Sequence, residues 1–141
     1  MRTLSVRQPW ATLLLAGKKR CEARGWQTSH RGPLAIHACS RFPQACRDLC
    51  EREPYRSLLH QLGYHGGTPL PLGVVLGTVR LLDCVRIEEV ADLPDEERLL
   101  GDYRPGCWVW RFADPVLLAE PIPISGRLGV FESPLFLPVS A

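Results

Sequence analysis

The sequence lacks a long apolar segment, and its longest apolar runs are only a handful of residues, as at 13–16. A membrane-spanning helix needs about 20 consecutive apolar residues, so the sequence predicts no membrane segment. Residues 1–4 lead directly into mixed polar sequence and not into the apolar core of a signal peptide. We therefore expect a cytoplasmic protein.

The signature motifs of several large enzyme classes are also missing. The sequence contains no P-loop, no GxGxxG turn, no GxSxG elbow and no HExxH or EF-hand pattern. It has no CxxC pair, and the spacing of Cys46 and Cys50 to His60 and His65 does not match the usual zinc ligand patterns. We therefore expect no metal and no cofactor, and we interpret the six cysteines as small buried side chains.

Lysine is scarce and the net charge is small. Fifteen of the 17 basic residues are arginine, and the formal net charge is only +2. The charge is uneven, because residues 1–56 hold eleven Lys and Arg against four Asp and Glu, whereas residues 57–141 hold six against eleven. This asymmetry indicates an anionic partner for the first half. Arginine suits planar phosphate recognition, although a GC-rich genome would produce the same bias.

What is present indicates one globular domain. The 141 residues, 45% hydrophobic and 23% charged, suffice for a single core, and we assign 1–141 to one domain. Apolar periodicity and the positions of Pro and Gly predict helices over 9–16, 43–62 with a break at Pro54, and 94–100.

Alternating or β-branched segments predict five to seven short strands, the clearest at 3–6, 20–27, 34–39, 73–87, 107–112 and 116–124. Asp114 and Pro115 predict a turn between the last two, and two further prolines make 116–124 an edge strand or an extended segment. The mixture of strands and helices favours an α+β fold, with a small curled sheet or barrel flanked by two or three helices.

Candidate functional residues concentrate between Ser5 and Arg31. Glu22 and Arg24 lie two apart on a predicted strand, so they share one face and are close enough to pair or to line a common cleft. Lys19 precedes them, and a partly desolvated lysine near a carboxylate can act as a base or a nucleophile.

Four more residues supply groups that suit nucleic-acid binding. Recognition of flexible RNA combines aromatic stacking with hydrogen bonds from amide or arginine side chains, which Trp26 and Gln8 can supply. His30 and Arg31 lie in a polar loop that suits contact with phosphate or carboxylate.

The segment Gly17-x-Lys19-x-x-Glu22-x-Arg24 resembles the GxKxxExR motif of the ASCH domain family. The preceding LSVRQPWA at 4–11 resembles the opening of that family, and HRGPL at 30–34 and the segment 118–131 resemble parts of its members. The resemblance covers nearly the whole chain. It implies a PUA-like fold, which is a small β-barrel flanked by helices with a cleft lined by the motif.

The resemblance also implies ligands related to RNA or nucleotides. The leading prediction is an RNA-binding module with a basic cleft. In that interpretation Lys19, Arg24 and Arg31 contact phosphate, and His30 lies in the same ligand-binding set. Gln8 reads a base or sugar edge, and Trp26 stacks on a base. Glu22 then orients the two basic side chains or accepts a hydrogen bond from a base amine.

Two alternatives remain open. The first is a small hydrolase that acts on a modified nucleoside of the N4-acetylcytidine type, or on RNA. One branch of the family resembles such an amidohydrolase and uses a Lys at the Lys19 position with a Thr and a distant Glu, whereas Glu22 stands at the Thr position here. Lys19 would be the base or nucleophile and Glu22 its acid–base partner. The second is a protein-interaction module, which predicts an exposed apolar patch and no special chemistry at Lys19.

Overall fold

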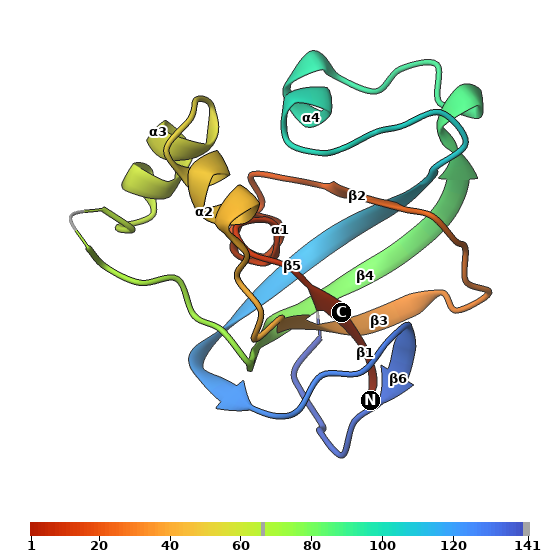
Figure 1. Cartoon of the computed structure of the whole chain (residues 1–141). Coiled ribbons are helices and arrows are strands. Elements are labelled where there is room, and N and C mark those ends of the chain that lie inside the picture. The colour runs from red at the N-terminus through yellow and green to blue at the C-terminus, as the bar shows by residue number, and fades with distance from the viewer. Residues whose placement is uncertain (66, 140–141) are drawn as a thin grey trace.

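The computed structural model describes residues 1–65 and 67–139, and it is built on a six-stranded sheet that curls into a half-barrel (Figure 1). The strands are β1 (Arg2–Val6), β2 (Cys21–Arg24), β3 (Gly32–Ala38), β4 (Val74–Arg86), β5 (Trp108–Pro123) and β6 (Val130–Glu132). Their order across the sheet is β2-β5-β4-β3-β1-β6. Strands β1 and β3 run parallel, and the other neighbours run antiparallel.

Short helices connect the strands: α1 (Trp10–Leu15), α2 (Gln44–Cys50), α3 (Tyr55–Gln61), the 3-10 turn η1 (Ile87–Glu89) and α4 (Asp95–Leu99). Figure 1 shows α2 and α3 together on one side of α1, whereas α4 stands apart above β2. The predicted α+β class is confirmed. The described chain has four α-helices where two or three were expected, because Pro54 separates α2 from α3. No helix within the described ranges is long and apolar enough to cross a membrane.

The main core lies between α1 and the inner face of the sheet. It includes Leu14 from α1, Ile36 from β3, Leu76 from β4 and the fully buried Trp110 from β5. The helix begins after Pro9 and ends before Gly17, whose φ of 73° is a left-handed conformation that favours glycine. Since α1 is so short, its burial against the sheet holds it in place more than its own helix propensity does.

Strands β4 and β5 form the longest pairing, from Val74 opposite Pro123 to Arg86 opposite Trp108. The turn predicted at Asp114 and Pro115 is wrong, because β5 continues through both residues to Pro123. The register shifts there, and Asp114 takes a φ of 53°, so a bulge accommodates the missing N–H of Pro115 without ending the strand.

The strand β6 and the turn η1 were not predicted. Each spans three residues, which is too short for an alternating or helical period to be visible in the sequence. Strand β6 forms through pairing with β1, where Leu4 lies opposite Val130. The partner lies more than a hundred residues away along the chain, so local sequence carries little sign of it.

We predict that Gly77→Ala destabilises the fold, because β4 and β5 approach each other closely at this residue. A Cβ at position 77 would overlap the carbonyl oxygen of Val116 and come within 2.7 Å of Leu15 Cδ1. Overpacking of this kind costs about 3 kcal/mol. The measurement is the free energy of unfolding by denaturant. Gly25→Ala is the matched control, since a Cβ there meets no heavy atom within 4 Å, and equal stability of the two variants would contradict the prediction.

Candidate functional site

A cavity of about 1040 Å³ opens beside the ends of β1, β2 and β3. Ser5 and His37 contribute from β1 and β3, and residues 22–25 contribute from β2 and its end. Three connecting segments complete the walls, at 39–41, 102–107 and 126–129. The cavity, called the cleft below, therefore combines sheet residues with loops that are far apart in the sequence.

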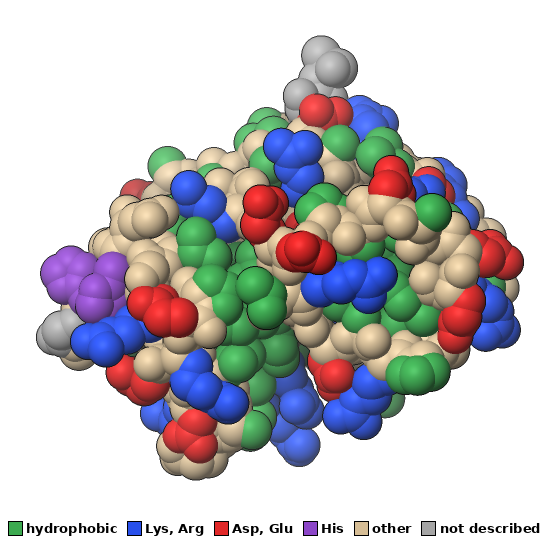
Figure 2. Space-filling view, turned by 90° about the horizontal axis from the view of Figure 1, so that it is seen from above, with side chains coloured by type: hydrophobic (Ala, Val, Ile, Leu, Met, Phe, Trp, Pro, Cys, Tyr) green, Lys and Arg blue, Asp and Glu red, His purple; other side chains and the backbone are tan. Residues whose placement is uncertain are grey.

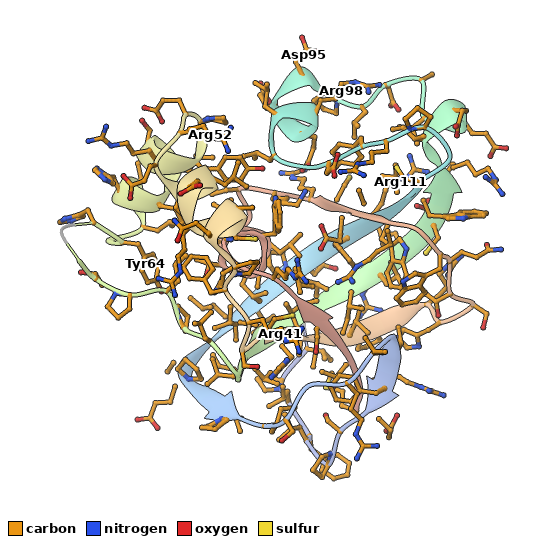
Figure 3. The ribbon with its side chains drawn as sticks, viewed as in Figure 1. Arg41, Arg52, Tyr64, Asp95, Arg98 and Arg111 are labelled. Carbon is orange, nitrogen blue, oxygen red and sulfur yellow. The ribbon has the colours of Figure 1, made fainter. Side chains whose placement is uncertain are left out.

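The cleft is rich in arginine. Its lining includes five arginines from five separate segments, against two carboxylates, those of Glu22 and Asp102; the arginines are Arg7, Arg24, Arg41, Arg104 and Arg127. Arg104 pairs with Asp102 at 2.8 Å. Figure 3 shows Arg41 near the centre of the molecule beside β1, and Figure 2 shows Lys and Arg side chains at the notched lower edge of the surface.

Three of these arginines are exposed and have no acidic partner among the described residues. Within residues 1–65 and 67–139, the side chains of Arg7, Arg41 and Arg127 form no ion pair and no hydrogen bond. No described residue therefore neutralises their charges. A cleft with such an excess of one sign concentrates oppositely charged ligands.

Glu22 and Arg24 lie on the cleft floor, on the shared face of β2 that their spacing predicts. Arg24 Nη2 lies 3.7 Å from Glu22 Oε2 and donates a 2.6 Å hydrogen bond to the backbone oxygen of Ser5. The Arg24 Nε is buried and has no hydrogen-bond partner among the described residues. The Arg24 side chain as a whole is 23% exposed, so its guanidinium can donate to a ligand in the cleft even though Nε itself is covered.

Lys19 does not line the cleft and is 1% exposed. Its Nζ lies 3.8 Å from Glu97 Oε2 and 3.5 Å from the Tyr103 hydroxyl. Glu97 also accepts hydrogen bonds from the Arg20 backbone N–H and from the Tyr103 hydroxyl. Lys19 thus joins the start of β2 to α4 and to the loop that forms one cleft wall.

The Tyr103 phenol stays protonated beside this pair. Burial raises the pKa of Tyr103 far above its ordinary value, and the neighbouring Glu97 carboxylate raises that pKa further. Tyr103 therefore remains a hydrogen-bond donor to Glu97 across the physiological range. Glu97 is the acidic partner of Lys19 that the sequence analysis did not identify, since 78 positions separate the two residues.

Gln8 is 0% exposed, and its amide is used within the protein. Its Nε2 donates to the Thr12 hydroxyl at 2.7 Å and to the Pro71 carbonyl at 3.0 Å, and its Oε1 accepts from the Thr12 backbone N–H. The contact expected between Gln8 and a ligand needs an exposed amide, which this conformation does not provide. Gln8 instead fixes the start of α1 against the loop before β4.

Trp26, His30 and Arg31 lie in the β2–β3 connection and do not line the cleft. Trp26 is 37% exposed and packs edge-on against Trp110, with ring centroids 4.8 Å apart. His30 contacts the Pro33 carbonyl through Nε2, and the exposed Arg31 donates to the backbone oxygens of Thr28 and His30. Of the seven predicted site residues, the structure brings Glu22 and Arg24 together in the cleft.

A sequence model of the ASCH domain matches residues 4–121. The chain belongs to the ASCH domain family. The family predicted from the GxKxxExR motif is thus confirmed, and the curled sheet with its short helices is consistent with the PUA-like fold of an ASCH domain.

Two curated relatives of this ASCH domain carry the name activating signal cointegrator 1. The human protein is 42% identical over 130 residues, and the mouse protein is 32% identical over 130 residues. Each match covers 92% of this chain but only 22% of the relative. This ASCH domain therefore spans about a fifth of the length of the relatives it matches.

The cleft contains residues that sequence reasoning missed. Arg104 and Arg127 come from the half of the chain with net negative charge, so the charge distribution did not indicate them as binding residues. Arg7 belongs to the LSVRQPWA segment at 4–11 that resembles the opening of the family. Ser5 and His37 also face the cleft, and their hydrogen bond could not be foreseen because it depends on the parallel pairing of β1 with β3.

The cysteines are not joined by disulfide bonds, and one of those that line the cleft is Cys39. All six cysteines are free thiols, and four of them are buried. Cys39 lines the cleft, and burial raises the pKa of its thiol even though Arg24 lowers that pKa, so the thiol stays protonated near neutral pH. In the described ranges, no three His, Cys, Asp or Glu side chains lie together as a metal site requires.

We predict that Lys19→Met lowers the free energy of unfolding by about 3 kcal/mol, because it leaves the buried Glu97 carboxylate without its cation. Chemical denaturation measures this loss. Lys18→Met is the matched control, since the neighbouring Lys18 is exposed and its replacement is expected to change stability by less than about 0.5 kcal/mol. A similar stability for both variants would show that the Lys19 pair is not structural.

Proposed function

We propose that this ASCH domain binds RNA or a related nucleotide ligand in its arginine-lined cleft. The observation that carries this proposal is the convergence of five arginines, three of them exposed and without ion pairs, on one cavity of about 1040 Å³. The guanidinium group binds phosphate oxygens in a bidentate manner, which makes arginine suited to phosphate recognition.

The size of the cleft suits a flexible ligand. Its volume lies at the upper end of the range for pockets that enclose small ligands, roughly 300–1,000 Å³. Protein recognition of RNA sequence is directed mostly at single strands, whose unstacked bases can enter a concave site. We therefore propose single-stranded RNA or a nucleotide, with its phosphates beside Arg7, Arg41 and Arg127.

Glu22 and Arg24 supply the means to recognise a base on the cleft floor. The carboxylate accepts hydrogen bonds from N–H groups, and the partly exposed Arg24 guanidinium donates to a base oxygen or ring nitrogen. The two lie side by side, so together they match a base edge that carries a donor next to an acceptor. Trp10 is half-buried and adds an apolar surface to the same cavity.

The other predicted site residues take supporting positions in this proposal. Lys19 and Gln8 hold α4 and α1 in place and thereby maintain the cleft walls. Trp26, His30 and Arg31 extend the interface along the β2–β3 connection, where the partly exposed Trp26 ring can stack on a base and Arg31 can contact phosphate. We also propose a cytoplasmic location for the domain.

The protein-interaction alternative has one observation in its favour. An apolar groove of about 410 Å³ lies between α3 and α4, where Figure 2 shows hydrophobic side chains gathered in the middle of the face. Leu99 at its edge is 62% exposed. The hydrolase alternative is less favoured, because Lys19, its proposed base, is covered by Glu97 and Tyr103 and does not line the cleft.

We predict that the triple variant Arg7→Ala, Arg41→Ala and Arg127→Ala binds short single-stranded RNA about a hundredfold more weakly. Each lost phosphate contact removes roughly 1 kcal/mol or more. The slope of log affinity against log salt should also fall by about 2, because each single-strand phosphate contact contributes about 0.7. Fluorescence anisotropy with labelled RNA at several salt concentrations measures both quantities.

The control replaces three exposed arginines outside the cleft, Arg52, Arg56 and Arg98, by alanine. This variant has the same change in net charge, so it separates a cleft contact from a general charge effect. Equal loss of affinity in both triple variants would contradict the proposal. If the wild-type protein binds no RNA and instead releases product from labelled RNA or N4-acetylcytidine, the hydrolase alternative replaces the binding proposal.

A further inference from the structure

Ser5 and His37 form a hydrogen-bonded pair at the cleft wall that the binding proposal does not use. The Ser5 hydroxyl lies 2.9 Å from His37 Nδ1, and His37 Nε2 lies 2.9 Å from the backbone oxygen of Ile124. His37 is 2% exposed, whereas Ser5 is half-buried, and both residues line the cleft. The adjacent strands β1 and β3 hold them in register.

The Ile124 carbonyl fixes the direction of the Ser5–His37 hydrogen bond. A carbonyl oxygen only accepts, so His37 Nε2 carries the proton and donates it to Ile124. In the neutral imidazole, Nδ1 is then the acceptor, and the Ser5 hydroxyl is the donor. This arrangement consists of a hydroxyl, a base within hydrogen-bond reach and a third group that orients the base, which is the pattern of an activated nucleophile.

Two neighbours complete the surroundings of the pair. Gly126 packs directly against the pair, since a Cβ there would come within 2.7 Å of His37 Cε1 and 2.8 Å of Ser5 Oγ, so a side chain does not fit at this position. Arg24 donates a hydrogen bond to the Ser5 backbone oxygen, and its own Nε lacks a partner among the described residues. The Arg24 side chain is 23% exposed, and a guanidinium beside a nucleophile is suited to stabilise a developing oxyanion.

We propose that Ser5 and His37 form a catalytic pair that hydrolyses a carboxylic ester on a phosphate-bearing molecule. The ester is favoured over an amide because a backbone carbonyl orients His37 but stabilises an imidazolium less than a carboxylate does, which suits an alcohol leaving group. The phosphate requirement comes from the arginines of the cleft and so rests on the proposed function, whereas the chemistry of the pair does not.

The reaction balances with water as the second reactant. Ser5 Oγ forms a bond to the ester carbonyl carbon while its proton moves to His37 Nδ1, and the negative charge on the carbonyl oxygen lies near Arg24. The bond from carbon to the alcohol oxygen breaks, and the leaving alcohol takes the proton from Nδ1. Water then attacks the acyl-Ser5 ester and gives a proton to Nδ1, which returns it to Ser5 Oγ as the carboxylic acid leaves.

The first experiment treats the intact protein with a fluorophosphonate probe and locates the adduct by mass spectrometry. We expect labelling at Ser5, loss of labelling in Ser5→Ala, and at least about hundredfold slower labelling in His37→Gln, since general-base catalysis contributes that much. Ser40→Ala is the matched control, because Ser40 is an exposed cleft serine with no hydrogen bond to a histidine. Gly126→Val, which places a side chain against the pair, should also slow labelling.

The second experiment compares hydrolysis of 3′-O-acetyl-adenosine 5′-monophosphate with that of 3′-O-acetyl-adenosine. We expect the phosphate-bearing ester to react at least tenfold faster, with turnover reduced to background in Ser5→Ala. Circular dichroism and thermal unfolding establish that each variant is folded. Absence of Ser5 labelling and of hydrolysis in the folded wild-type protein would overturn the proposal, and equal rates on both esters would overturn its phosphate requirement.

The RNA-binding assay on the same variants separates this proposal from the binding function. Ser5→Ala should retain RNA affinity, and the triple arginine variant should retain probe labelling at Ser5. Labelling at Ser5 in a protein that binds no RNA would support the catalytic pair while removing the RNA-binding proposal. The reverse result, RNA binding without labelling, would leave the cleft as a binding site and overturn the catalytic pair.

Discussion

The pairing of β4 with β5 is the constraint on which the rest of the molecule depends. These two strands extend through most of the sheet, and the other strands, α1 and the main core are arranged around them (Figure 1). Their register shifts bend the pair, which allows the sheet to curl. At Gly77 the strands and α1 approach so closely that no side chain fits. The curl brings β1, β2 and β3 together at one end, and the cleft forms there.

The charged residues of the GxKxxExR motif have two different surroundings. Lys19 does not line the cavity and pairs with Glu97, so the lysine of the GxKxxExR motif contributes to the packing of α4 against the start of β2. The motif residues Glu22 and Arg24, two positions apart on β2, face the cavity. Lys19 lies just before β2 and contacts Glu97 of α4, whereas Glu22 and Arg24 lie on β2 and line the cavity.

The sequence predicted well those features that depend on local pattern. The helix at the Pro9 and Gly17 boundaries, the long strand β4 and the α+β class all follow from periodicity and from residues with fixed backbone preferences. Strand β6, the continuation of β5 through Pro115 and the Glu97 partner of Lys19 depend on contacts between distant segments. The burial of Gln8 could not be predicted from the sequence either. A glutamine beside an exposed helix start and a glutamine that caps a buried turn have the same local sequence.

The arginines of the cleft come from positions as far apart as 7 and 127, so no single segment of the chain carries the site. Opening of any one wall would disperse the positive charges, and the proposed affinity for a polyanion would be lost with it. A ligand that contacts arginines from all five segments binds only when every wall is in place. By thermodynamic linkage, such a ligand stabilises the whole fold and not a single loop. At a ligand concentration of 100 times the Kd this contribution is about 2.7 kcal/mol. The occupied domain would then resist unfolding and proteolysis along its entire length.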